Sequence, residues 1–185
     1  MIQAVLNATP LFWPGVLCSL ALAALFARPT ARLLRAHRAV GFLLLLALGA
    51  IVTLTLLPDI RFSITDNARY NTTGCQLTGG PRPLSELLSP TQSTLNVALF
   101  VPLGITAALA GTRRRAAVAG LTAATLPFLI EFLQGELPAL GRACDVQDIW
   151  DNLFGLLIGL TLGLLTGPWA RAAVRRLRRP GTDAA

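Results

Sequence analysis

Five long apolar runs constrain the fold of this chain more than any other feature of its sequence. Each run is close to the roughly 17–25 residues that a membrane-spanning helix needs. The five runs lie at residues 10–27, 39–57, 94–111, 116–134 and 149–168. We therefore predict an all-α, polytopic membrane protein with five transmembrane helices. We expect a single membrane domain over residues 1–185, with the helical bundle at residues 10–168.

The composition agrees with a chain that lies in lipid. Of its 185 residues, 54% are hydrophobic and 14% are charged, whereas a soluble domain carries about 25% charged residues. The first apolar run has its arginines after it rather than before it, the reverse of a secretory leader, so we expect a retained first helix. The net charge of +7 indicates anchoring at the lipid bilayer. We expect no nucleic-acid partner, because no aromatic stacking surface accompanies the basic residues.

The arginines predict how the helices are oriented. All 16 basic positions are arginine, and most of them follow the first, third and fifth apolar runs. The positive-inside rule makes these three segments cytoplasmic. The N-terminus then lies outside, the C-terminus lies in the cytoplasm, and residues 169–185 form a basic cytoplasmic tail. The long connection between the second and third helices, residues 58–92, is then an extracytoplasmic loop.

The start of the fifth run combines acidic side chains with glycines on one helix face. At about 100° per residue, the members of this face fall within an arc of roughly 80°. They are Asp145, Asp148, Asn152, Gly155 and Gly159. Asp145 or Asp148 alone can be explained as a cap at the N-terminus of the helix. The glycines, joined by Gly163 at the same spacing, favour close packing against another helix.

Polar side chains from other segments reach the same outer level in this topology. Glu131 and Gln134 share a face near the outer end of the fourth run. Ionised carboxylates in a spanning segment cost several kcal/mol unless they are paired or hydrated, so we expect Glu131 to face inward. Asn96 as a link between helices, and Arg142 as a purely structural partner of a carboxylate, are the alternatives. The predicted ligand-binding site consists of Asn96, Glu131, Gln134, Arg142, Asp145, Asp148 and Asn152.

The three cysteines fall into two groups. Cys75 and Cys144 both lie in predicted outer connections, in a compartment that permits disulfides. We predict that they pair and tie the long connection to the entrance of the fifth helix, with two independent thiols as the alternative. Cys18 lies inside the first run, and we expect it to behave as a small apolar residue.

Several classes of active site are excluded by residues that the sequence lacks. The only histidine, His37, lies in an arginine-rich cytoplasmic segment. Neither a Ser–His–Asp or Cys–His site nor a zinc site with histidine ligands can therefore form at the outer end. No Walker motif or dinucleotide fingerprint is present. Oxygen-ligated Mg²⁺ or Ca²⁺ at Glu131, Asp145 and Asp148 stays open, although we expect no cofactor and favour a polar network satisfied within the protein.

Three stretches in the second half of the chain resemble the VanZ-like family of small bacterial membrane proteins. They are "NVALFVPLG" (Asn96–Gly104), "LIEFLQ" (Leu129–Gln134) and "GRACDVQDIWDNLFGLLIG" (Gly141–Gly159). The resemblance places a VanZ-like core at residues 94–168 and implies a multi-pass protein of the bacterial plasma membrane. It also implies a part in resistance to glycopeptide antibiotics of the teicoplanin type. It implies no agreed catalytic residues.

Three functions are compatible with these residues. The first, which we favour, is non-enzymatic: the polar site binds or modifies an outer-leaflet component of the cell envelope, such as a lipid, a lipid-linked wall precursor or a lipoglycopeptide. The second is an enzyme that uses carboxylates or a divalent metal on a lipid-linked substrate, with Glu131 as the best candidate for a general base. The third is a structural membrane subunit whose polar network only sets the register of the helices.

Overall fold

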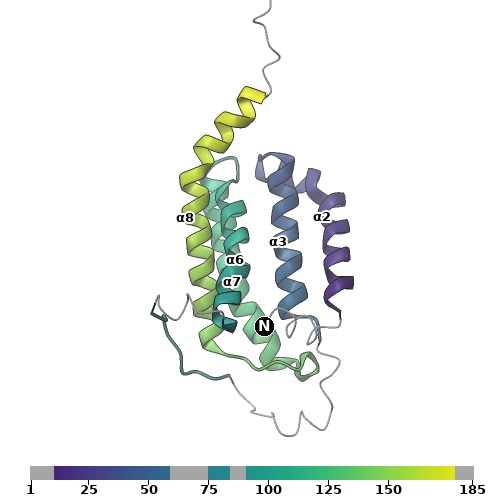
Figure 1. Ribbon diagram of the computed structural model, residues 1–185, viewed down its shortest axis with the longest axis vertical. Helices are drawn as coiled ribbons and strands as arrows, with labels where there is room; N and C mark the ends of the chain where they lie inside the picture. Colours follow the sequence, from purple (N-terminus) through teal and green to yellow (C-terminus); the bar gives the residue numbers. More distant parts are fainter. Residues whose placement is uncertain (1–10, 59–74, 84–90, 178–185) are drawn as a thin grey trace, which may run out of the picture.

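The computed structural model is a bundle of long helices that run along one common direction (Figure 1). It describes residues 11–58, 75–83 and 91–177. Within these residues the chain forms α2 (Phe12–Leu34), α3 (Arg38–Thr55), α6 (Gln92–Ala108), α7 (Arg113–Glu136) and α8 (Val146–Leu177), with a 3₁₀ turn, η1 (Pro138–Leu140). The predicted all-α class is confirmed for this part of the chain. Most of the long connection before α6, and residues 178–185 of the predicted tail, lie outside the described residues.

Four of these helices are long and apolar enough to cross a membrane: α2, α3, α7 and the first 24 residues of α8. The fifth predicted span corresponds to α6, which is apolar but has only 17 residues. At about 1.5 Å per residue it covers about 26 Å, slightly less than the roughly 30 Å of a typical hydrocarbon core. That α6 crosses the membrane therefore stays a prediction.

The helices extend beyond the apolar runs at their charged ends. α2 continues to Leu34, so Arg28 and Arg32 lie on its last turns and not in a connection. α7 begins at Arg113, before the apolar run, because the Thr112 hydroxyl caps it by accepting a hydrogen bond from the Arg115 amide. Hydropathy marks only the part of a helix that suits lipid, whereas backbone hydrogen bonds continue to the cap. The predicted boundaries of α2 and α7 were short at these ends for this reason, whereas α3 and α6 end at Thr55 and Ala108, before the predicted runs do.

The predicted boundaries of α8, the longest helix, were also short. It begins at Val146, three residues before the predicted span, and continues past Pro168 to Leu177. The predicted span ended at the proline, but a proline interrupts only its own backbone hydrogen bond, so the helix continues beyond it. Asp148 therefore lies within the first turn of α8, close to the positive end of the helix dipole.

α2 packs almost entirely on α3, through small side chains. Ser19, Ala23, Ala27 and Ala31 recur every four residues on α2, and all four are buried. A Cβ atom on Gly49 of α3 would collide with Ser19, so the glycine permits close approach. Small residues at this spacing bring helices together in membranes by close backbone packing.

The α6–α8 pair has the most extensive interface of the bundle. A Cβ atom on Gly155 would collide with the Val97 carbonyl, and one on Gly159 would collide with the Val101 carbonyl. On the facing helix, Gly104 lies equally close to the backbone of α8. The packing role that the sequence predicted for the α8 glycines is confirmed.

A central apolar core joins the helices halfway along the bundle. Ile51 of α3, Phe100 and Leu103 of α6, Ile130 of α7 and Leu156 of α8 are all almost completely buried. Since these five side chains come from four helices, the core holds α3 against the α6–α7–α8 group. The two ends of the bundle lie above and below this core.

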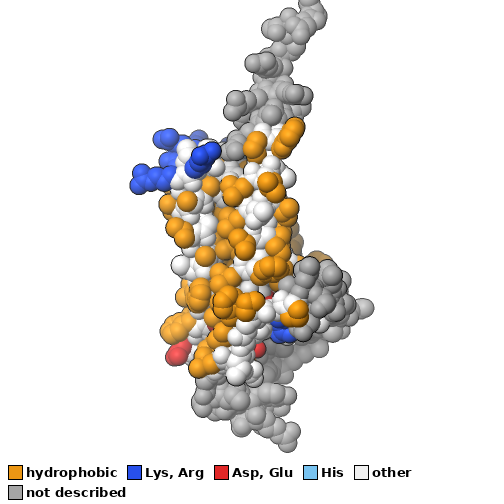
Figure 2. All heavy atoms as spheres, turned by 90° about the vertical axis from the view of Figure 1, so that its left-hand side faces the viewer, with side chains coloured by type: hydrophobic (Ala, Val, Ile, Leu, Met, Phe, Trp, Pro, Cys, Tyr) orange, Lys and Arg blue, Asp and Glu red, His pale blue; other side chains and the backbone are white. Residues whose placement is uncertain are grey.

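Charge divides the two ends of the bundle. Figure 2 shows a cluster of basic side chains at one end, whereas the acidic side chains lie near the other end together with a smaller basic patch. We call the first the arginine end; it holds the α2–α3 and α6–α7 turns, which meet where the Gly111 amide donates a hydrogen bond to the Leu34 carbonyl, at 2.9 Å. We call the second the carboxylate end; it holds Glu131 and the start of α8. The side of the membrane on which each end lies stays a prediction.

Candidate functional site

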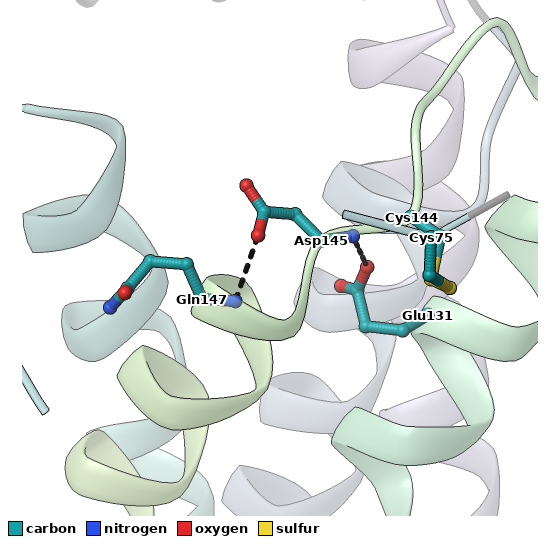
Figure 3. Close-up of a disulfide and its surroundings, with 5 residues drawn as sticks. All are labelled: Cys75, Glu131, Cys144, Asp145 and Gln147. Atoms are coloured by element: carbon teal, nitrogen blue, oxygen red, sulfur yellow. Dashed lines mark hydrogen bonds between the residues drawn. A yellow bond between two sulfur atoms is a disulfide. The ribbon is translucent and has the colours of Figure 1, made fainter. Parts of the chain in front are cut away.

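A short segment of the long connection is fastened across the start of α8. We call residues 75–83 the strap. Cys75 of the strap forms a disulfide with Cys144, the pair that the sequence analysis expected (Figure 3). The next residue, Gln76, forms two backbone hydrogen bonds of 3.0 Å: its amide donates to the Cys144 carbonyl, and its carbonyl accepts from the Val146 amide.

Side chains continue this attachment along the first turns of α8. The Gly80 amide donates to Oε1 of Gln147 at 3.1 Å, and Nε2 of Gln147 donates to Oδ1 of Asp151 at 3.1 Å. Oδ2 of Asp151 lies 3.8 Å from Nε of Arg82. Asp151 is only 2% exposed, so its charge is matched by the strap and not by solvent. No sequence pattern indicated the Gly80–Gln147 contact, because the two residues are 67 positions apart.

The Asp145 side chain caps α8 and points away from Glu131. Its Oδ1 accepts a hydrogen bond of 2.8 Å from the Gln147 amide. Its own backbone amide donates to Oε2 of Glu131, also at 2.8 Å. Figure 3 shows the Asp145 side chain directed away from Glu131, towards the helix that it caps. The structure therefore supports the capping interpretation of Asp145 and does not place this side chain with the other candidate ligand-binding residues.

Glu131 and Gln134 fasten α7 to its neighbours. Glu131 is 2% exposed and, through the Asp145 amide, fixes the position at which α8 begins. One turn further on, Nε2 of Gln134 donates to the Thr55 carbonyl at 2.9 Å. That carbonyl belongs to the last turn of α3, where helical carbonyls have no intrahelical partner. Each side chain thus satisfies a backbone group at a helix end.

A pocket of about 680 Å³ opens beside these contacts. We call it the carboxylate-end pocket. Its apolar wall comes from α3 and α6 and includes Ala47, Ala50, Leu54, Leu95 and Leu99. Its polar wall contains six of the seven predicted ligand-binding residues, namely Asn96, Glu131, Gln134, Arg142, Asp148 and Asn152. Gln92, at the start of α6, also lines it and was not predicted, because one isolated amide at a helix terminus gives no periodic signal.

One hydrogen-bond acceptor on the polar wall has no donor within the described part of the chain. It is Oδ1 of Asn152, a residue that is only 2% exposed. Two other pairs on this wall do interact: the Asn96 side-chain amide donates to the Asp148 carboxylate, and the positive charge of Arg142 favours the ionised form of Glu131. A buried acceptor without a donor costs about 1–3 kcal/mol, so a ligand that supplies a donor to Asn152 recovers this energy.

Among the described residues, no group of three His, Cys, Asp or Glu side chains is arranged to hold a metal ion. The reason is visible at Asp145, whose carboxylate is used as the cap of α8. Of the three oxygen ligands proposed for Mg²⁺ or Ca²⁺, only Glu131 and Asp148 line the pocket.

Comparison with protein-family models matches residues 42–167 to the family described as VanZ/LLP1. The match covers more than half of the chain. It begins within α3, ends within α8 and includes every residue that lines the carboxylate-end pocket. α2 lies outside it. Comparisons with curated proteins and with solved structures gave no match.

Proposed function

The chain belongs to the VanZ/LLP1 family, and from this premise we propose that it binds the headgroup of a lipid-linked envelope component in the carboxylate-end pocket. The observation that carries the proposal is the buried, unpartnered Oδ1 of Asn152 on the polar wall of that pocket. No donor among the described residues reaches this acceptor, and a buried acceptor without a donor lowers stability. A ligand that supplies the donor gives the acceptor a role.

The two walls of the pocket suit an amphipathic ligand. Sugar hydroxyls and peptide amides of a lipid-linked wall precursor supply donors for Asn152 and Asp148. A phosphate group finds Arg142, and the lipid chain leaves across Leu95 and Leu99 towards the membrane. The volume of about 680 Å³ lies within the roughly 300–1,000 Å³ of typical small-molecule sites, so it holds part of such a headgroup.

The proposed orientation puts this pocket at the outer leaflet of the bacterial plasma membrane. Two independent features support it: the arginines collect at the opposite end, as the positive-inside rule requires, and the disulfide between Cys75 and Cys144 is expected in an oxidising compartment. Lipoglycopeptides of the teicoplanin type act at this surface and carry both sugars and an acyl chain. A contribution to resistance would follow from their capture, or from occupation of their lipid-linked target.

Binding to the purified full-length protein in detergent micelles tests the proposal. The probe is a polyprenyl-pyrophosphate-linked disaccharide pentapeptide, compared with polyprenyl phosphate, which has the chain but no sugar or peptide. We expect Asn152→Leu to weaken binding of the first probe by about tenfold or more, the effect of one lost buried hydrogen bond. Binding of the second probe should change little.

Thr161→Val is the matched control, because it removes a polar group from an exposed site on the same helix and outside the pocket. Asn152→Leu removes an unpartnered acceptor, so the variant should be at least as stable as the parent protein. Unchanged affinity in a folded Asn152→Leu protein would contradict the proposal and leave a structural role for the pocket.

A further inference from the structure

A second pocket lies at the opposite end of the bundle, between α3 and α7. We call it the arginine-end groove. Its volume is about 730 Å³, and its walls are apolar: Leu44 and Leu48 from α3, Leu103 from α6, and Ala123 and Leu126 from α7. None of the residues that line it contributes to the carboxylate-end pocket. The buried core, which includes Leu103, lies between the two.

Three arginines stand at the mouth of this groove. Arg35 comes from the α2–α3 turn, and Arg114 and Arg115 come from the first turn of α7. Nη1 of Arg115 is buried and has no hydrogen-bond partner among the residues that the structure describes. A buried guanidinium nitrogen of this kind needs an acceptor, because desolvating a donor without replacing its hydrogen bond is unfavourable.

The backbone fixes the positions of these three arginines and adds to the positive electrostatic potential at the mouth of the groove. Thr112 caps α7 at the mouth, so the positive end of the helix dipole faces the same region. The carbonyl of Arg35 packs so closely on Gly111 that a Cβ atom there would collide with it. Arg35 itself has a left-handed backbone, φ 50°, which is uncommon for a residue with a side chain. The two turns therefore lock together with their arginines side by side.

No acidic side chain in the described part of the chain balances this charge. Glu131, Glu136, Asp145, Asp148 and Asp151 are the acidic residues that the structure describes, and all of them belong to the carboxylate end. The mouth of the groove thus combines uncompensated positive charge with an apolar interior that opens to the side of the bundle. Complementary charge must come from outside the described residues.

We propose that the arginine-end groove is a binding site for one anionic phospholipid. Its phosphate lies against Arg35, Arg114 and Arg115, and one of its acyl chains occupies the groove between α3 and α7. A free phosphate would use the arginines and leave the apolar interior empty, whereas a neutral apolar molecule would leave Nη1 of Arg115 without an acceptor. An anionic lipid supplies both a phosphate for the arginines and an acyl chain for the apolar interior. The site is separate from the pocket of the proposed function, and neither proposal depends on the other.

Native mass spectrometry of the full-length protein tests this site. The protein in detergent micelles is titrated with phosphatidylglycerol or with phosphatidylcholine carrying the same acyl chains. We expect phosphatidylglycerol to be retained at least about tenfold more strongly. The double variant Arg114→Gln/Arg115→Gln should lose this preference, because it removes two of the three cations at the mouth.

The matched control is Arg32→Gln/Arg38→Gln, which removes the same charge from exposed arginines near the same end but outside the groove. It should retain the preference. A second variant, Ala119→Phe, fills the groove while leaving every arginine in place, and we expect it to release both lipids.

Three results would overturn the proposal. Equal retention of the two lipids would show that the mouth does not recognise the net negative charge of the lipid headgroup. An equal loss in the control double variant would show diffuse attraction to the whole basic end. Competition by inorganic phosphate, together with no effect of Ala119→Phe, would show a simple anion site. In each case the folded state is checked by circular dichroism.

Discussion

The two ends of this bundle have pockets of similar size, but they satisfy their polar groups in different ways. At the carboxylate end, side chains are fastened to the protein: Glu131 to the Asp145 amide and Gln134 to the Thr55 carbonyl. At the arginine end, Arg114 and Arg115 have no acidic neighbour among the described residues. Both pockets border α3, at about 680 and 730 Å³.

This difference shows which of the two pockets the protein preorganises through its own contacts. Hydrogen bonds between side chains and helix ends fix the carboxylate end before any ligand arrives, and a disulfide adds to them. In the proposed lipid site, the arginine end would take its missing partners from its surroundings. We therefore expect the carboxylate end to respond to changes within the protein and the arginine end to respond to the lipid around it.

Among the changes that compare the two ends, removal of the disulfide should lower the free energy of unfolding most. The double variant Cys75→Ser/Cys144→Ser opens a link across 69 residues, for which a loss of about 2–5 kcal/mol in the free energy of unfolding is expected. Binding at the carboxylate-end pocket should weaken, and phosphatidylglycerol retention at the arginine end should not change. The free energy is measured by denaturant titration in mixed micelles.

Cys18→Ser is the control, because Cys18 is a free cysteine on α2. A reducing agent should reproduce the effect of the double variant in the parent protein only. If the double variant loses lipid retention as well, the two ends are coupled and the contrast between them fails.

Glu131 gives the next largest effect and also separates a positioning role from catalysis. Glu131→Ala leaves the Asp145 amide without its acceptor, and we expect a loss of about 1–3 kcal/mol in unfolding free energy. Glu131→Gln keeps an oxygen acceptor and removes the charge, so its stability should stay closer to the parent. Hydrogen exchange at the Asp145 amide checks this: fast in the first variant and slow in the second.

A different outcome for Glu131→Gln would favour the enzymatic alternative. If this variant stays folded and still binds the wall precursor but loses its effect on the envelope in cells, the carboxylate itself performs chemistry. Retained cellular function would leave Glu131 as a brace between α7 and α8.

The α6–α8 interface tests whether the two ends share one scaffold. Gly159→Ala places a methyl group against the Val101 carbonyl, and overpacking of this kind costs about 1–3 kcal/mol. Ligand binding should weaken at both pockets together, because α6 lines each of them. Gly120→Ala is the control: its Cβ would meet only the flexible Leu160 side chain at 3.3 Å, and alanine favours the helix.

Removal of the two helix caps should have the smallest effects on stability. It compares the two ends directly, because one cap lies at each end. Asp145→Ala at the carboxylate end and Thr112→Ala at the arginine end each remove one capping bond, worth about 0.5–2 kcal/mol. Asp145→Ala should cost more, because the carboxylate also interacts with the helix dipole. Thermal unfolding of both variants, with Asp145→Asn as a cap-retaining control, measures the difference. A larger loss for Thr112→Ala would reverse the expected ranking.

The sequence predicted the parts of this protein that depend on local pattern. Apolar length identified the helices, since lipid requires every backbone group in a span to be satisfied within the helix. Glycines four residues apart predicted that another helix packs closely on the fifth apolar run, and the structure shows that this helix is α6. The spacing of polar residues near helix ends named most of the polar wall, including Asn96 and Asn152, because residues on one face and at one depth must lie near each other.

Tertiary structure alone decided the contacts between segments far apart in the chain. Whether Asp145 faces a ligand or caps its own helix depends on where α8 begins, and Glu131 on another helix fixes that point. The strap residues Gly80 and Arg82 reach α8 from a connection without periodicity, so no sequence pattern revealed their partners. The arginine-end groove lies between α3 and α7, close to the point where the α2–α3 and α6–α7 turns meet. Such spaces depend on the relative placement of helices, which packing sets and local hydrogen bonding does not.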